Sequence, residues 1–389
     1  MQKPFPELTH LRLGGFAYGE PGPILPDSFL GGTAPRLRSL NLYRVPFLGL
    51  PKLLSSATHL VDLDLSFIPR SGFIPPEVMA TTLSALTSLE SLRLDFQYPR
   101  PRAALESRRP LPRPLTRSIL PSLMQFRFKG ASEYLEDILA PIDTPRLDTM
   151  QITFFNQLIF DTPQLFQFIN RRPMLSAPRK GYIVFDYMAI IVKFPSQTSD
   201  GVLSVEIPCA LSERQLSSLK QICTSSLLPV STLEDLYIFD DRAYWQDGVE
   251  NTLWLELLHP FTAVKNLYLS REFVPRIAPA LQELVGGRTT EVLPNLENIY
   301  LEGFQPSISR YSSLEEELCC YSPFRDGLGD SLYLPPAVAL PRMGVGGQPL
   351  SGTHSSAWAE PLEAPLTHYQ SFVGGLGDSR LQSPSQGWV

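Results

Sequence analysis

The chain of 389 residues contains few of the residues and runs that mark several protein classes. It has five scattered histidines and four cysteines (Cys209, Cys223, Cys319 and Cys320) with no CxxC spacing, so neither a metal site nor a disulfide framework is expected. The longest apolar candidate, residues 182–192, is broken by Asp186 and is too short to span a bilayer. The N-terminal residues hold no apolar stretch typical of a signal peptide. These absences predict an intracellular location, cytoplasmic or nuclear.

Catalytic and cofactor motifs are also missing. The sequence has no GxSxG elbow, no P-loop and no HExxH pair. Gly344 and Gly346 begin like a dinucleotide-binding fingerprint, but Pro349 occupies its third glycine position. We therefore expect no enzymatic activity, no cofactor and no metal. The net charge of −6 argues against nucleic acid as a partner, and nothing indicates a membrane.

What the sequence does contain is a repeat. An apolar residue, two variable residues, an apolar residue, one variable residue and an apolar residue recur along the chain. The first positions of the ten matches are Leu8, Leu37, Leu60, Leu89, Leu123, Leu147, Val202, Leu233, Val264 and Leu296. The interval between Leu147 and Val202 is about two periods, and residues 181–185 supply a degenerate strand within it. Together with 38 prolines, this pattern indicates many short elements joined by turns.

The repeat predicts an α/β fold. Alternate residues of a strand point to opposite faces, so the paired apolar residues are buried while the residue between them faces away from the core. Helical periodicity follows in residues 132–140, 212–223, 251–259 and 276–285, and Thr162-Pro163 starts another helix with Leu165, Phe168 and Ile169 facing inward. One unit cannot bury its own apolar face, so units must stack. We expect a leucine-rich-repeat-like solenoid, a horseshoe with a parallel inner sheet and outer helices.

The repeats also resemble a family. Matching stretches lie at residues 26–32, 34–40, 50–54, 55–63, 128–130, 134–137, 254–261, 263–269 and 276–290. They are similar to the fungal (basidiomycete) F-box and leucine-rich-repeat-like proteins over about residues 5–307. The resemblance implies a solenoid that recognises the protein substrate of a ubiquitin ligase.

Relatives of that family carry an N-terminal F-box that binds the ligase adaptor. This chain begins within a repeat, so adaptor binding is assigned to no residue here and is expected only if an F-box lies upstream. Two alternatives remain open: a free-standing interaction scaffold without a ligase link, and a truncated or mis-spliced fragment without function.

The domain boundary is expected near residue 307. Residues 1–307 carry the repeats, whereas residues 308–389 are rich in glycine, proline and serine and contain Gly-Leu-Gly-Asp-Ser twice, at 327–331 and 375–379. Such composition predicts a disordered tail or a misread frame. The adjacent Cys319 and Cys320 lie in this tail and are interpreted as incidental.

The concave face of the solenoid is the expected partner-binding surface. The residue between the two strand leucines is Arg12, Asn41, Asp64, Arg93, Arg127, Gln151, Glu206, Tyr237, Tyr268 and Tyr300 in successive units. The C-terminal part is thus a row of tyrosines, beside which Phe239 adds apolar area, and exposed tyrosines on a rigid support are common binding hot spots. The candidate binding residues are Tyr237, Tyr268, Tyr300, Phe239, Arg93, Arg127 and Asp64. The alternative is that the tyrosines only stabilise neighbouring strands.

Two charged features have weaker interpretations. Residues 98–117 carry six arginines among prolines, which fits an arm that recruits an acidic partner, or an ordinary solvated loop. Asp62 and Asp64 project from one strand on the same side, a spacing that fits a cation or a basic peptide, or simply a solvated polar face.

Overall fold

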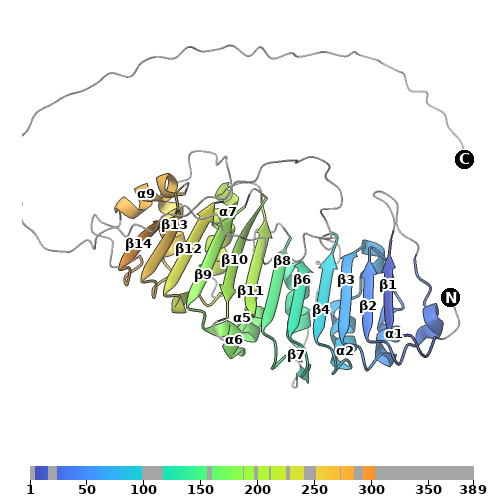
Figure 1. Ribbon diagram of the computed structural model, residues 1–389. Helices are drawn as coiled ribbons and strands as arrows, with labels where there is room; N and C mark the ends of the chain where they lie inside the picture. The colour runs from blue at the N-terminus through green and yellow to red at the C-terminus, as the bar shows by residue number, and fades with distance from the viewer. Residues whose placement is uncertain are drawn as a thin grey trace, which may run out of the picture. The chain divides into compact units, whose positions relative to one another are not determined.

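The computed structural model describes residues 5–15, 24–98, 117–155, 160–186, 188–196, 200–209, 212–224, 228–240, 251–271, 273–283 and 292–302. These residues form a mixed α/β fold built on a twelve-stranded sheet, most of whose strands are parallel (Figure 1). Residues 99–116, with most of the arginine-rich segment, and the expected tail at 308–389 lie outside the described residues.

The sheet runs across the repeats. In spatial order its strands are β1 (His10–Gly14), β2 (Ser39–Tyr43), β3 (Asp62–Ile68), β4 (Ser91–Phe96), β6 (Gln125–Gly130), β8 (Thr149–Phe154), β11 (Val202–Pro208), β10 (Ala189–Pro195), β9 (Lys180–Phe185), β12 (Asp235–Asp240), β13 (Asn266–Ser270) and β14 (Asn298–Glu302). Two short strands, β5 (Ser118–Ile119) and β7 (Ile142–Asp143), pair separately.

Helices connect the parallel strands. They are α1 (Leu50–Ser56), α2 (Pro76–Ser84), α4 (Ser132–Leu139), α5 (Pro163–Asn170), α6 (Pro173–Ser176), α7 (Ser212–Thr224), α8 (Asn251–Leu258) and α9 (Val274–Glu283), with short 3₁₀ turns at Phe29–Gly32, Arg70–Gly72 and Val230–Thr232. Helices α1, α2, α5 and α6 have proline in the first turn, where its fixed φ favours the helix and its missing N–H costs nothing. Three of these helices thus begin at a proline, and α1 has one as its second residue.

The sequence repeat recurs in the backbone hydrogen bonds. In each turn before a strand, one N–H donates to the carbonyl of the corresponding residue one unit earlier: Val61 to Arg38, Glu90 to Val61 and Met124 to Glu90, at 2.8, 2.8 and 2.9 Å. A second series joins Glu234 to Arg179, Lys265 to Glu234 and Glu297 to Lys265, at 2.9, 2.9 and 2.8 Å. These backbone hydrogen bonds therefore join successive units both in the N-terminal part of the sheet and in its C-terminal part.

One face of the sheet carries the core. Burial alternates along the strands, so that Leu40 and Leu42 of β2 are buried while Asn41 between them is partly exposed. The predicted inward residues of α5, Leu165, Phe168 and Ile169, are also buried. We call the opposite side of the sheet the open face.

The middle of the sheet departs from the predicted topology. The expected strand at 181–185 is β9, but β10 follows it in an antiparallel hairpin and β11 pairs antiparallel with β10. Strand β11 thereby reaches β8, whereas β9 lies beside β12. The prediction of a wholly parallel sheet is therefore wrong at β10. The apolar alternation of β10 resembles that of its neighbours, and alternation carries no information on strand direction.

The hairpin also corrects one repeat assignment. The sequence match placed Val205 and Ile207 in the core positions and Glu206 between them. In the structure Leu203 pairs with Met150 and Val205 with Ile152, so the match was two residues out of register. Strand β11 alternates over seven residues, so the motif fits it in more than one register.

Gly181 marks where the hairpin joins the second series of units. It pairs with Leu236 and so takes the position of a core leucine. A Cβ at Gly181 would lie 2.8 Å from Leu233 Cδ1 and 3.2 Å from Phe194 Cε1. The side chains of Leu233 and Phe194 already fill the space, which explains why the strand looked degenerate in the sequence.

The helix predictions differ mainly at the ends. Helices α4, α5, α7 and α8 lie where periodicity placed them, and α9 begins at Val274, two residues before the expected start. Gln215 in the first turn of α7 donates from its amide to the carbonyls of Cys209 and Asp186, at 2.5 and 3.2 Å. It thus ties the helix to the preceding hairpin.

Glu136 of α4 caps the next helix in the chain. Its buried carboxylate accepts hydrogen bonds from the N–H groups of Gln164 and Leu165 at 2.7 and 2.8 Å, at the start of α5. Burial raises the pKa of Glu136 to about 7, outweighing these two hydrogen bonds, which lower it. One buried carboxyl therefore links two consecutive units in a pH-dependent way.

Because of this link, we expect the difference in unfolding free energy between the wild type and Glu136→Gln to depend on pH. A raised pKa in the folded state gives stability that is complete below the unfolded pKa and is lost as pH rises through about 7. The difference in unfolding free energy between wild type and Glu136→Gln should fall by about 2 kcal/mol from about pH 5 to about pH 8. Urea denaturation of both proteins measures it. A difference that is constant, or that grows with pH, contradicts this assignment.

Candidate interaction surface on the open face

The residues of the open face form a central row that crosses the whole sheet. Strand register aligns Arg12, Asn41, Asp64, Arg93, Arg127, Gln151, Ser204, Lys193, Tyr182, Tyr237, Tyr268 and Tyr300, one from each strand. All are partly or fully exposed. The row has a charged part on β3, β4 and β6 and an aromatic part on β9, β12, β13 and β14.

The aromatic part is a stack of four tyrosine rings, which we call the tyrosine stack. Ring centroids of Tyr182 and Tyr237 are 4.7 Å apart, those of Tyr237 and Tyr268 4.1 Å, and those of Tyr268 and Tyr300 4.6 Å. The interplanar angles are 15°, 7° and 12°. Parallel strands about 4.8 Å apart hold side chains of equal register at this stacking distance.

The structure places the three predicted tyrosines side by side and adds a fourth. Tyr182 was absent from the predicted row because chain order put Glu206 next to Tyr237, whereas pairing puts Tyr182 there. Phe239 lies on the same face, with its ring centroid 6.1 Å from that of Tyr237 and 6.4 Å from that of Tyr182. It is buried, only 4% exposed, so it supports the stack and adds little accessible area.

The tyrosine stack carries no charge near neutral pH. Burial, and then the neighbouring Tyr268, raise the pKa of the Tyr237 phenol above its ordinary value of 10.0. Below the stack, at the start of the same strands, the Asn266 amide donates to Asp235 at 2.7 Å and the Asn298 amide donates to Asn266 at 2.9 Å. A neutral aromatic strip therefore lies beside a hydrogen-bonded polar strip.

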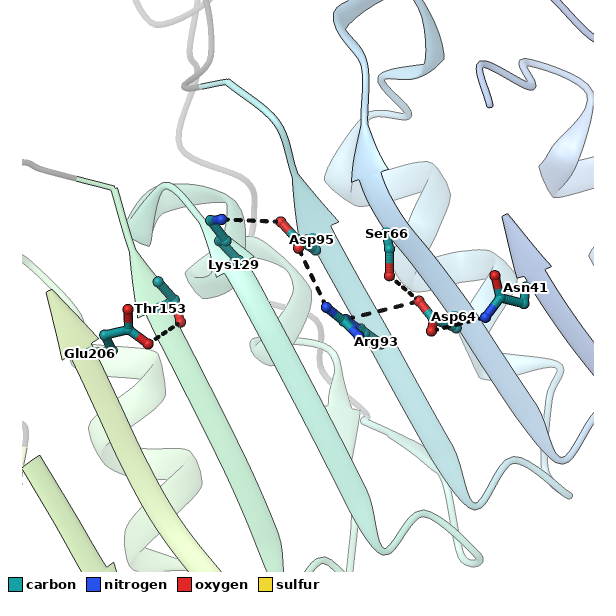
Figure 2. A network of polar contacts seen from close by, with 8 residues as sticks. All are labelled: Asn41, Asp64, Ser66, Arg93, Asp95, Lys129, Thr153 and Glu206. Carbon is teal, nitrogen blue, oxygen red and sulfur yellow. Dashed lines mark hydrogen bonds and ion pairs between the residues drawn. The ribbon is translucent and has the colours of Figure 1, made fainter. Parts of the chain in front are cut away.

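The charged part is a network in which most acids already have partners (Figure 2). The Asp64 carboxylate accepts from Asn41 at 3.2 Å and from Ser66, and lies 3.9 Å from Arg93. Asp95 lies 3.7 Å from Arg93 and 3.9 Å from Lys129. Burial raises the pKa of Asp95 despite the attraction of Lys129 and Arg93.

Several of the predicted binding residues therefore form ion pairs or hydrogen bonds within the chain. Arg93 and Asp64 pair with each other, and Asp62 accepts from the Ser39 hydroxyl at 3.1 Å. Arg127 lies beside Arg93 in the central row. In the described part of the chain, no group of three or more His, Cys, Asp or Glu side chains could hold a metal ion. Asp62 and Asp64 are thus part of a hydrogen-bonded polar surface.

One small cavity lies on the core side of the sheet. A cavity between the sheet and the first two helices, lined by Leu42, Phe47, Ile74 and Tyr134 among others, encloses about 20 Å³, roughly the room for one water molecule. Among the helices that the structure describes, none is long and apolar enough to cross a membrane.

Comparisons with known proteins give a structural likeness at low sequence identity. No protein-family model matches the chain, and no curated protein matches it. Among solved structures, the chain is similar to the leucine-rich repeat-containing protein LegL7 from Legionella pneumophila. The identity is 15%, the TM-score is 0.31, and the alignment covers 69% of this chain and 75% of LegL7.

Proposed function

We propose that this chain is a non-catalytic, protein-binding module of the leucine-rich-repeat solenoid type, and that it binds its partner through the open face. The observation that carries the proposal is the tyrosine stack, four partly exposed rings in register on adjoining strands. The buried residues of the described helices belong to the core on the other side of the sheet, so no helix that the structure describes covers these rings.

Physical chemistry favours binding at such a surface. Tyrosine buries a large area with few rotatable bonds, and a stacked ring has already lost part of its conformational freedom before a partner arrives. The neighbouring Asp235, Asn266 and Asn298 supply a polar rim beside the apolar rings. A central aromatic patch with a polar rim is the usual composition of a protein-binding site.

Affinity capture compares the wild-type chain with the double variant Tyr237→Ala/Tyr268→Ala. The proposal expects at least one protein that binds the wild type and is lost from the variant, while both baits keep the same thermal transition. Equal capture by the two baits, with both folded, would place binding elsewhere.

The finer proposal is that the module recognises the substrate of a ubiquitin ligase. It rests on the resemblance of about residues 5–307 to the F-box and leucine-rich-repeat-like family. A longer form that carries an upstream F-box should co-purify with a ligase adaptor. Co-purification of partners without an adaptor, from that longer form, favours the free-standing scaffold instead. Loss of cooperative unfolding by the chain would favour the third alternative, a fragment without function.

A further inference from the structure

We propose that the open face takes an extended acidic peptide segment, whose carboxylates pair with Arg127 and Lys193 and whose aromatic or proline ring packs on the tyrosine stack. This inference rests on the proposed binding function and adds the chemistry of the partner. It follows from two cations of the central row, Arg127 and Lys193, that form no ion pair within the described part of the chain.

Arg127 is the first of these cations. Its neighbour Arg93 lies within 4 Å of both Asp64 and Asp95, and Asp95 also faces Lys129, so the nearby acids are already shared. The Arg127 guanidinium makes no ion pair in the described part of the chain. Burial and then the like charge of Arg93 lower the pKa of Arg127, while Asp64, which already pairs with Arg93, raises it only in part. A partly desolvated cation beside a second cation is stabilised by an incoming carboxylate.

Lys193 of β10 is the second cation. Its register partners are Ser204 on one side and Tyr182 on the other, both uncharged. The acid that acts on it is Glu206, which accepts from the Thr153 hydroxyl at 3.2 Å (Figure 2). Among the described residues, Glu206 and Lys193 form no ion pair. Burial lowers the pKa of Lys193 and raises that of Glu206, so neither group is well compensated by the other.

The distance between Arg127 and Lys193 predicts how far apart the two acids of the peptide lie in its sequence. Arg127 and Lys193 are three strands apart in the central row, about 14 Å at roughly 4.8 Å a strand. Tyr182 is the next residue of the row after Lys193. An extended peptide advances about 3.3 Å a residue, so its two acids should be about four residues apart, with a ring one to three residues beyond the second acid.

Charge complementarity favours this partner over others. Basic peptides would face two cations on the binding path, and two of the acids that could attract them, Asp64 and Asp95, already pair with Arg93 and Lys129. The continuous phosphate backbone of a nucleic acid would also pass Asp64, Asp95 and Glu206 on the same face, whereas a peptide with two acids can place its charges at Arg127 and Lys193 alone.

The test uses a random dodecapeptide library displayed on phage, selected against the full wild-type chain. The proposal expects enriched peptides with two acids about four residues apart followed by an aromatic residue or proline. Replacing both acids of a selected peptide by Asn or Gln should weaken its binding about tenfold or more, and about 500 mM salt should weaken it further. This peptide-side measurement does not depend on the folding of any protein variant.

Protein variants complete the test. Arg127→Gln/Lys193→Gln should lose about tenfold or more in affinity for the selected peptide, whereas Arg146→Gln/Lys52→Gln, with the same change of charge away from the central row, should bind as the wild type does.

Enrichment of neutral or basic peptides, no enrichment, equal binding of the neutralised peptide, or tighter binding of a 12-nucleotide DNA strand to the same residues overturns the inference. If a selected peptide is sensitive to Tyr268→Ala but not to the charge variants, the proposed function stands and this inference fails. If it is sensitive to neither, both fail.

Discussion

Replacement of Tyr268 by alanine should reduce the affinity for the open-face partner about 30-fold or more, which corresponds to about 2 kcal/mol. Tyr268 lies between Tyr237 and Tyr300 in the stack, with ring centroids 4.1 and 4.6 Å away. Its removal leaves a gap in the middle of the aromatic strip, so a partner loses contact with a ring and the neighbouring rings lose their support. Titration of the selected peptide, or of a captured partner, against wild type and variant measures the loss.

Two controls separate binding from strand stabilisation. Tyr268→Phe keeps the stacked ring and should retain most of the affinity, whereas Tyr98→Ala removes an exposed tyrosine outside the sheet and should change nothing. A residue used only for cross-strand packing costs about 0.2–1 kcal/mol of stability. If Tyr268→Ala lowers the melting temperature but leaves binding unchanged, the stack is structural, and binding would move toward Arg93 and Arg127.

The largest expected effect on stability comes from Trp254. This residue of α8 is fully buried and makes edge-to-face contacts with Phe185 of β9, at 5.7 Å, and with Phe273 before α9, at 5.0 Å. It therefore joins three successive parts of the fold directly behind the strands that carry the tyrosine stack. Trp254→Ala should lower the unfolding free energy by about 3–5 kcal/mol, because a large cavity replaces these contacts.

Urea denaturation of Trp254→Ala measures this loss. Trp254→Phe keeps one ring and should lose less than half as much, and Leu48→Ala, at an exposed position, should stay within about 0.5 kcal/mol of the wild type. A loss below about 1 kcal/mol for Trp254→Ala would mean that the units around α8 contribute little to the cooperative core.

Much of the fold was predictable because the repeat specifies local burial. The spacing of Leu37, Leu40 and Leu42 fixes two inward residues of a strand and one in the turn before it, and all three are buried. The start of α5 followed equally from Thr162-Pro163. These predictions depend on short-range patterns, and each pattern lies within a single repeat unit.

The antiparallel hairpin could not be predicted in the same way. Ile190, Val192 and Phe194 alternate as a strand of either direction would, and their pairing with β11 and β9 depends on residues up to 17 positions away along the chain. The hairpin exchanges the spatial order of β9 and β11. Chain order therefore gave the wrong neighbour for Tyr237.

The candidate site likewise contains some residues that the sequence could align and others that only the structure could place. Tyr237, Tyr268 and Tyr300 share one position in three consecutive units, and the sequence was sufficient to align them. Tyr182 and Lys193 enter the row only through the hairpin, so their place beside the stack required the structure. The absence of an internal partner for Arg127 among the described residues likewise depends on how Arg93, Asp64 and Asp95 pair in three dimensions.

Hydroxyl-radical footprinting with mass spectrometry, in the presence and absence of the selected peptide, tests the central claim most directly. The account predicts protection of Tyr182, Tyr237, Tyr268 and Tyr300 when the peptide binds. It predicts no protection of Tyr98, which is 50% exposed outside the sheet, or of Val78 on α2, which is 42% exposed. Protection of Val78 without protection of the four tyrosines would place the partner on the helices and contradict the account.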